Sequence, residues 1–171
     1  MEMTACRRCG TPLTPTGPHA FQCANQHPIY ANATPTVGVF FVTADNRVLL
    51  AVRGIEPHKG MLDSFGGFLD GDETFEAAAA RELTEELALT PADYEPLSYL
   101  TSGAGQYPFK GEVLPVITVF FWTRLITPES LTPRDDVAAI QSLPLRGLDL
   151  ALLHDQDIRV GIQALQRLFP G

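Results

Sequence analysis

The chain has 171 residues, of which 45% are hydrophobic, and its formal net charge at pH 7 is −8. This length and apolar content are enough for one main globular domain with a small appendage. The negative charge argues against broad binding to nucleic acid or to an anionic membrane, because both are polyanions. Any anionic ligand therefore needs a local site, and we expect a metal ion there.

The sequence offers no signal for a membrane or for secretion. No apolar run reaches the roughly 18 residues of a membrane span, and the first residues, MEMTACRRCG, lack the apolar core of a signal peptide. We therefore expect a cytoplasmic protein without a membrane partner. A reducing compartment disfavours disulfides, so the grouping of the three cysteines indicates either a metal site or no special role.

Residues 1–33 are rich in Cys, Pro and polar residues and show neither a helical nor a strand period. Four of them have the spacing of a zinc site with three cysteines and one histidine: Cys6, Cys9, Cys23 and His27. A zinc-ribbon-like module is therefore predicted over 1–33, since so few apolar residues give it little else to fold around. Two alternatives stay open. His19 could be the fourth ligand, or the site has decayed, because Gln26 stands where a zinc ribbon usually has its fourth cysteine.

From residue 34 onward the sequence alternates between strand-like and helix-like segments, which predicts a second domain over 34–171. Apolar and β-branched runs predict strands over 36–43, 47–53, 95–100 and 113–125. Helical spacing of apolar residues predicts helices over 74–88 and 155–169. Loops are expected over 54–73, which is rich in glycine, and over 101–111. This order predicts an α/β or α+β fold in which helices cover a mixed sheet.

The first predicted helix ends in three glutamates: Glu82, Glu85 and Glu86. At 3.6 residues per turn they lie within an arc of about 100° that faces away from the helix's apolar stripe. That stripe consists of Ala80, Leu83 and Leu87. The carboxylates repel one another and oppose the helix dipole, and a solvated acidic face would explain them without any function. The preceding Gly66-Gly67 pair, which lets a ligand approach the backbone, instead favours a site for a hard cation such as Mg²⁺.

The glutamates belong to a longer pattern, G-x5-E-x7-R-E-U-x-E-E-x-G-U, in which U is a bulky aliphatic residue. Eight residues match it: Gly67, Glu73, Arg81, Glu82, Leu83, Glu85, Glu86 and Leu89. This pattern resembles the signature of the Nudix hydrolase family. Ala88 departs from it where the family usually has glycine, and Phe65 where proline is usual. The resemblance implies an α/β/α sandwich that holds Mg²⁺ or Mn²⁺ against a diphosphate, so that water cleaves the pyrophosphate bond of a nucleoside diphosphate linked to another group.

The resemblance also implies roles for individual residues. The catalytic candidates are Glu73, Arg81, Glu82, Glu85 and Glu86. The last three glutamates, with the carbonyl of Gly66, would bind the metal, while Glu73 and Arg81 would brace the loop against the helix. The general base stays open between these glutamates and the later acids Glu112 and Asp136.

A zinc ribbon ahead of this signature is similar to the arrangement in the NADH pyrophosphatases. Their downstream S-Q-P-W-P-F-P-x-S motif has only a partial counterpart here, GQYPFK over 105–110, in which Tyr107 or Phe109 could stack on a base. Gly67 and Arg53 are further candidates for substrate contact, although Arg53 could equally form a surface ion pair.

The expected substrate is a small nucleoside diphosphate compound such as NADH or ADP-ribose. The alternative is a non-catalytic module that senses a nucleotide. The C-terminal helix could also pair two copies into a homodimer.

Overall fold

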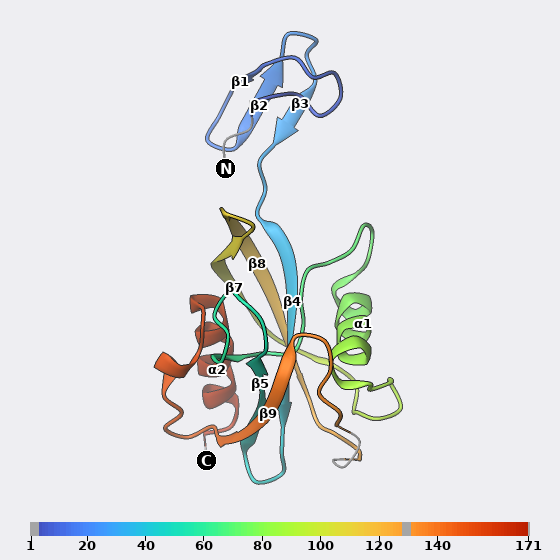
Figure 1. Ribbon diagram of the computed structural model, residues 1–171, viewed down its shortest axis with the longest axis vertical. Helices are drawn as coiled ribbons and strands as arrows, with labels where there is room; N and C mark the ends of the chain where they lie inside the picture. The colour runs from blue at the N-terminus through green and yellow to red at the C-terminus, as the bar shows by residue number, and fades with distance from the viewer. Residues whose placement is uncertain (1–3, 128–130, 171) are drawn as a thin grey trace.

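The computed structural model describes residues 4–127 and 131–170, so residues 1–3 of the first predicted domain and residues 128–130 and 171 of the second lie outside the described part. The described residues form two β-sheets (Figure 1). The small antiparallel sheet contains β1 (Leu13–Pro15), β2 (Ala20–Cys23) and β3 (Pro28–Tyr30). The six-stranded mixed sheet contains β4 (Thr34–Val42), β5 (Arg47–Arg53), β6 (Leu62–Asp63), β7 (Ser98–Phe109), β8 (Glu112–Thr123) and β9 (Val137–Pro144).

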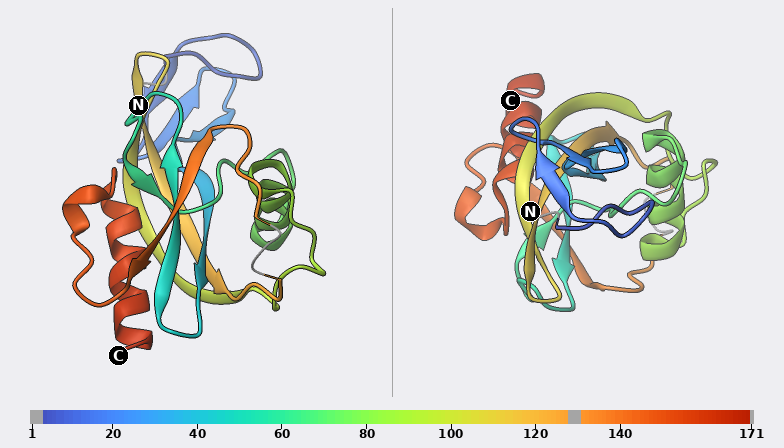
Figure 2. Two further views of the ribbon diagram at one scale, coloured as in Figure 1. Left: turned by 60° about the horizontal axis from the view of Figure 1, so that its bottom comes forward. Right: turned by 90° about the horizontal axis from the view of Figure 1, so that it is seen from above.

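Two α-helices cover opposite faces of the larger sheet, as the views in Figures 1 and 2 show. They are α1 (Phe75–Leu87) and α2 (Gln156–Leu168), and a short 3-10 helix, Leu150–Leu152, precedes α2. Successive side chains of a strand point to opposite faces, so Phe41 packs in the core beneath α1 while Phe40 packs in the core beneath α2. The predicted α/β/α sandwich with a mixed sheet is confirmed. Among the described residues, neither helix combines the length and the apolar character needed to cross a bilayer.

Local sequence sets the ends of both helices. The hydroxyl of Thr74 accepts a hydrogen bond from the Ala77 N–H and caps the start of α1, and Asp155 caps α2 in the same way through the Gln156 N–H. Helix α1 ends at Ala88, whose φ of 59° lies in the left-handed region. This is the backbone conformation for which glycine is usual, and alanine adopts it here.

The predicted loop over 101–111 is wrong, because β7 continues as a strand to Phe109. A two-residue turn of Lys110 and Gly111, both with positive φ, then leads directly into β8. The glycines of this strand serve close packing. A Cβ atom on Gly103 would lie 2.9 Å from the Cα atom of Asp157 at the start of α2. Strand β9 was not predicted at all, although it pairs with the whole length of β5.

The larger sheet splits between β4 and β5. These strands pair only beside their connecting turn, where Phe41 faces Leu49 and Val42 faces Val48. Beyond that point a segment, residues 62–69, lies between them, and we call it the wedge. Its β6 part pairs with the end of β5, while Phe65 and Gly67 form backbone hydrogen bonds with β4. The hydrogen bond from the Val37 N–H to the Gly67 carbonyl therefore holds the Gly66-Gly67 pair against β4.

Candidate metal and substrate site

A cavity of about 310 Å³ opens where β4 and β5 separate. Its walls come from α1, the wedge, the strands β4, β5, β7 and β8, and the start of α2. This volume lies at the lower end of the range for small-molecule sites. The charged side chains in its lining are mostly carboxylates, and the basic ones are Arg53, Arg81 and His154. Such a lining repels a free diphosphate, so an anionic substrate would need a cation beside it.

Glu86 is buried in this cavity, with only 5% of its surface exposed. The prediction that the three glutamates share an exposed face of α1 is therefore wrong: the side chain of Glu82 is 13% exposed, and only Glu85, at 49%, is open to solvent. The buried face of α1 is rotated toward the glutamates and consists of Ala78, Ala79, Leu83, Glu86 and Leu87. Ala80, predicted to be buried, is only partly so.

Neighbouring backbone explains this rotation. The N–H of Gly66 in the wedge donates to Glu86 Oε2 at 2.9 Å, and the N–H of Arg134 donates to the Glu86 carbonyl at 2.8 Å. The wedge and the chain around Arg134 thus cover a side of α1 that helical periodicity alone assigns to solvent. The chain thus places a carboxylate where an apolar side chain would otherwise stand.

The electrostatics of Glu86, which is buried, and Glu82, which is partly buried, fit a cation. Burial, with the charges of Asp136 and Glu82, raises the pKa of Glu86 well above its ordinary value. Burial also raises the pKa of Glu82, although Arg81 acts in the opposite direction. Desolvation and like charges both disfavour ionised carboxylates, and a divalent ion would compensate them. Oxygen ligands of this kind suit Mg²⁺ or Mn²⁺.

Arg81 joins the wedge to α1. Its Nε and Nη2 atoms donate to the two carboxylate oxygens of Glu73, each at 2.9 Å, and Nη2 also donates to the Phe68 carbonyl at 3.0 Å. Its Nη1 atom donates to Glu82 at 2.8 Å and to Glu85 at 3.1 Å. The hydrogen bonds from Arg81 lower the pKa of Glu73 to about 2. This two-pronged contact is a strong one, and it has the geometry expected of a brace.

The two glycines of the wedge allow the backbone to come close to its neighbours. Gly66 has a φ of 141°, and a Cβ atom there would lie 2.1 Å from the Val37 carbonyl oxygen. A Cβ atom on Gly67 would lie 2.6 Å from Glu82 Oε1. Any side chain at Gly66 would displace β4, so glycine is required there, and a side chain at Gly67 would push the Glu82 carboxylate aside. Both glycines line the cavity.

A second polar wall of the cavity is formed by β5, the β6 part of the wedge and His154, two residues before the start of α2. Arg53 Nη1 donates to Asp63 Oδ2 at 2.7 Å, and His154 Nε2 lies 2.8 Å from the same oxygen. Burial acts to raise the pKa of Asp63, but His154 and Arg53 outweigh it, so the pKa lies below its ordinary value. Arg53 is only 7% exposed, so its ion pair is not the surface pair considered above. Asp63 and His154 were missed because no spacing pattern links residues so far apart in the chain.

Aromatic residues continue this wall. Tyr107 lies on β7 and not in a loop, its hydroxyl accepts a hydrogen bond from Arg53 Nη2 at 3.2 Å, and its ring centroid is 5.5 Å from that of Phe68. Tyr107 and Phe68 line the cavity, whereas Phe109 packs 6.1 Å from Phe68 outside the lining. Of the two later acids considered as general base, Asp136 lines the cavity, and Glu112 lies at the far end of β8 outside it.

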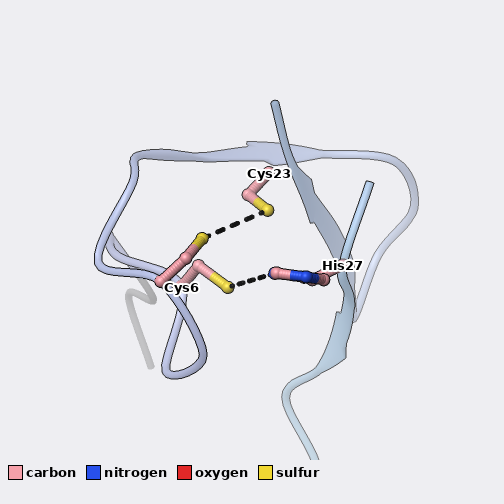
Figure 3. Close-up of side chains that lie close together, drawn as sticks. Cys6, Cys23 and His27 are labelled. Carbon is pink, nitrogen blue, oxygen red and sulfur yellow. Dashed lines mark hydrogen bonds between the residues drawn. The ribbon is translucent and has the colours of Figure 1, made fainter. Parts of the chain in front are cut away.

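The small sheet brings the predicted zinc ligands together. The ligand atoms of Cys6, Cys9, Cys23 and His27 lie within 4.8 Å of one another, and Figure 3 shows the labelled side chains converging. The sulfur atoms of Cys9 and Cys23 are 3.8 Å apart, and Cys6 Sγ lies 3.6 Å from His27 Nδ1. A tetrahedral zinc ion with Zn–S bonds of about 2.3 Å and Zn–N bonds of about 2.0–2.1 Å requires edges of about 3.8 and 3.6 Å. The group therefore fits zinc, and His27 rather than His19 completes it.

The carboxylates of α1 are spread more widely. Within residues 4–127 and 131–170, the cysteine and histidine group is the one set of three or more possible metal ligands that comes so close together. Arg81 holds Glu82 and Glu85, whereas the Gly66 N–H holds Glu86. The glutamates are thus engaged with donors of the protein, and a metal ion would have to compete with Arg81 for Glu82 and Glu85.

Comparison with known proteins agrees with this geometry. The NUDIX domain family matches residues 32–165. An ADP-ribose pyrophosphatase from Methanocaldococcus jannaschii is 32% identical over 119 residues, which cover 69% of this chain and 67% of that protein.

Two solved structures are similar in fold. A NUDIX hydrolase from Nitrosomonas europaea has a TM-score of 0.65 at 22% identity, over 98% of this chain and 91% of its own. The NUDIX domain of Shewanella oneidensis NrtR, solved with ADP ribose, has a TM-score of 0.60 at 23% identity, over 81% and 90%. The family resemblance of the glycine and glutamate pattern is confirmed, and the chain belongs to the Nudix hydrolase family.

Proposed function

We propose that this protein is a divalent-metal-dependent pyrophosphohydrolase that cleaves ADP-ribose or a similar nucleoside diphosphate linked to a second group. The observation that carries the proposal is Glu86, a carboxylate buried in a cavity beside Glu82 and Asp136 with no cationic side chain bound to it in the described residues. The family match and the Methanocaldococcus jannaschii relative support the pyrophosphohydrolase class. The same relative supports ADP-ribose, whereas only the zinc-site spacing supports NADH.

In this proposal Glu82, Glu85, Glu86 and the Gly66 carbonyl would hold Mg²⁺ or Mn²⁺. The ion would neutralise the diphosphate, orient a water molecule and lower the pKa of that water. Arg81 and Glu73 keep the wedge at a fixed distance from α1, which sets where the phosphates lie. The attacking water gives its oxygen to one phosphorus and its proton to a carboxylate, either a helix glutamate or Asp136. The phosphoric anhydride bond breaks and two monophosphates leave.

A substrate screen that identifies the products tests this function. Purified full-length protein is incubated with Mg²⁺ or Mn²⁺ and, separately, with ADP-ribose, NADH, NAD⁺, FAD, diadenosine polyphosphates and nucleoside triphosphates. We expect AMP from ADP-ribose, and none when EDTA replaces the metal. Release of AMP from NADH but not from ADP-ribose would instead favour the NADH pyrophosphatase subgroup. If no compound is cleaved while ADP-ribose still binds, the protein is a nucleotide sensor and the proposal fails.

We further propose that residues 1–33 form a separate zinc-binding module ahead of a Nudix domain over 34–171. The expected metal content is one zinc ion per chain, measured by mass spectrometry on protein purified without added metal. Replacing His27 with alanine, or Cys9 with serine, should remove most of this zinc, because each supplies one of four ligands. The matched control is His19→Ala, which should keep it. Full zinc content in His27→Ala would contradict the site.

The cytoplasmic location and the homodimer, for which the C-terminal helix is the candidate contact, both stay predictions from the sequence. Neither affects the chemistry proposed for the cavity.

A further inference from the structure

Three side chains in the cavity wall are hydrogen-bonded to one another and have no role in the proposed chemistry. Thr36 on β4 and Thr118 on β8 face each other across a parallel strand pair, with their hydroxyl oxygens 2.7 Å apart. Thr118 donates in turn to Asp157 Oδ2, in the first turn of α2. Thr118 and Asp157 are buried, Thr36 is partly exposed, and all three line the cavity. We call this row the hydroxyl relay.

The direction of the relay follows from counting protons. The Ile158 N–H donates to Asp157 Oδ1 at 2.8 Å, and the N-terminus of α2 favours negative charge at this position. Burial raises the pKa of Asp157, while the hydrogen bonds from Thr118 and Ile158 act in the opposite direction. As a carboxylate, Asp157 can only accept, so the single hydroxyl proton of Thr118 points to it. Thr36 must then donate its own proton to Thr118.

This direction gives Thr36 a defined polarity toward the cavity. With its proton committed to Thr118, the Thr36 oxygen can offer only lone pairs to a ligand. Such an atom accepts a hydrogen bond and cannot give one. A ligand group that carries only lone pairs would face it with no proton between them.

The surroundings of Thr36 indicate which part of a substrate would lie there. Thr36 forms a backbone bridge with Phe68, and the Phe68 ring packs against that of Tyr107. Val116, also in the cavity lining, lies on the neighbouring strand. Flat aromatic and aliphatic surfaces of this kind suit a planar heteroaromatic ring. Sugar hydroxyls both donate and accept, so a fixed acceptor would not discriminate among them.

We propose that Thr36 accepts a hydrogen bond from the exocyclic amino group of the substrate's nucleobase, so that the cavity selects an amino base such as adenine over an oxo base such as hypoxanthine. The inference rests on the proposed function, since it concerns the base of that substrate. The carbonyl oxygen of hypoxanthine would meet the lone pairs of Thr36, and a hydrogen bond left unmade in a cavity weakens binding by about tenfold or more.

The test compares ADP-ribose with inosine diphosphate ribose, in which a carbonyl replaces the amino group. The ratio of their kcat/KM values with Mg²⁺ is the main readout, and the ratio of their affinities, from calorimetry with Ca²⁺ in place of Mg²⁺, is the second. Wild-type protein should prefer ADP-ribose by about tenfold or more. Thr36→Val should bring the ratio close to one. Thr34→Val, on the same strand but outside the cavity lining, should keep the wild-type ratio.

Asp157→Asn provides a test of the relay itself. The Ile158 N–H needs an acceptor, so it keeps the amide oxygen of the new side chain on its side and turns the amide nitrogen toward Thr118. The nitrogen donates to Thr118, Thr118 then donates to Thr36, and Thr36 presents its proton to the cavity. The preference should shift toward inosine diphosphate ribose, although Thr36, the proposed contact with the base, has not changed. A wild-type ratio in Asp157→Asn would overturn the relay.

The outcomes separate this inference from the proposed function. Equal kcat/KM for both compounds in wild-type protein overturns the inference and leaves the pyrophosphohydrolase standing. If neither compound is cleaved but ADP-ribose binds with a preference that Thr36→Val removes, the inference holds and the hydrolase proposal fails. If neither compound is cleaved or bound, both fail.

Discussion

Replacing Glu86 with glutamine is expected to lower kcat with Mg²⁺ on the order of 10³-fold, because the variant loses the most buried of the proposed metal ligands. The amide oxygen can still accept the hydrogen bond from the Gly66 N–H, so the fold should be unchanged. Steady-state kinetics on ADP-ribose, with circular dichroism on the same samples, measures both effects. The matched control is Glu85→Gln on the same helix. Because the Glu85 side chain is half-exposed, Glu85→Gln should lower kcat only about tenfold.

The stability of Glu86→Gln gives a second readout. Burial raises the pKa of Glu86 in the folded protein, so the ionised form destabilises the fold, and this penalty grows as the pH rises from the unfolded pKa to the folded pKa. In EDTA at neutral pH, the glutamine variant should therefore unfold at the same temperature as wild-type protein or higher. Added Mg²⁺ should stabilise wild-type protein and have little effect on the variant. Full turnover in Glu86→Gln would exclude the proposed metal site.

Gly66→Ala is expected to have the largest effect on stability, about 3–5 kcal/mol in the free energy of unfolding. The added Cβ atom would lie 2.1 Å from the Val37 carbonyl oxygen, at a φ of 141°. Either β4 or the wedge must move. Because both line the cavity, activity should also be lost. Denaturant unfolding monitored by fluorescence measures the loss in stability.

Gly60→Ala is the control for this variant. Gly60 also has a positive φ, 85°, but a Cβ atom there would meet nothing within 4 Å. It should cost about 1–2 kcal/mol, the backbone penalty alone. Equal losses in the two variants would show that the contact with Val37 is relieved by a small shift.

The parts of the site that could be predicted from the sequence are those encoded locally. Gly67, Glu73, Arg81 and the glutamates lie within one short segment, where fixed spacing determines both the loop and the helix. The cysteine module is a similar case. Each half of its site, Cys6 with Cys9 and Cys23 with His27, is a short local spacing, and the two halves come together when the strands of the small sheet pair. The burial of Glu86 could not be predicted, because it depends on Arg134 and the wedge, and helical periodicity carries no information about either.

Non-local pairing explains the other differences. Gly103 and Gly105 favour a loop by composition, yet they lie in β7 where the start of α2 approaches. Asp63 and His154 meet only after β6 has joined β5 and the chain has returned along β9. The sequence does not show which of these distant residues come into contact, so the second wall of the cavity is visible only in the structure.

The split between β4 and β5 has a dynamic consequence. The wedge forms backbone hydrogen bonds with strands on both sides, including those of Phe65 with Val39 and of Gly67 with Val37. Segments tied into a sheet in this way open together with it and not as independent flaps. The amides of Val37, Val39 and Phe65 should therefore exchange with solvent deuterium as slowly as the central strands. The loop at the centre of the site belongs to the same cooperative unit as the core.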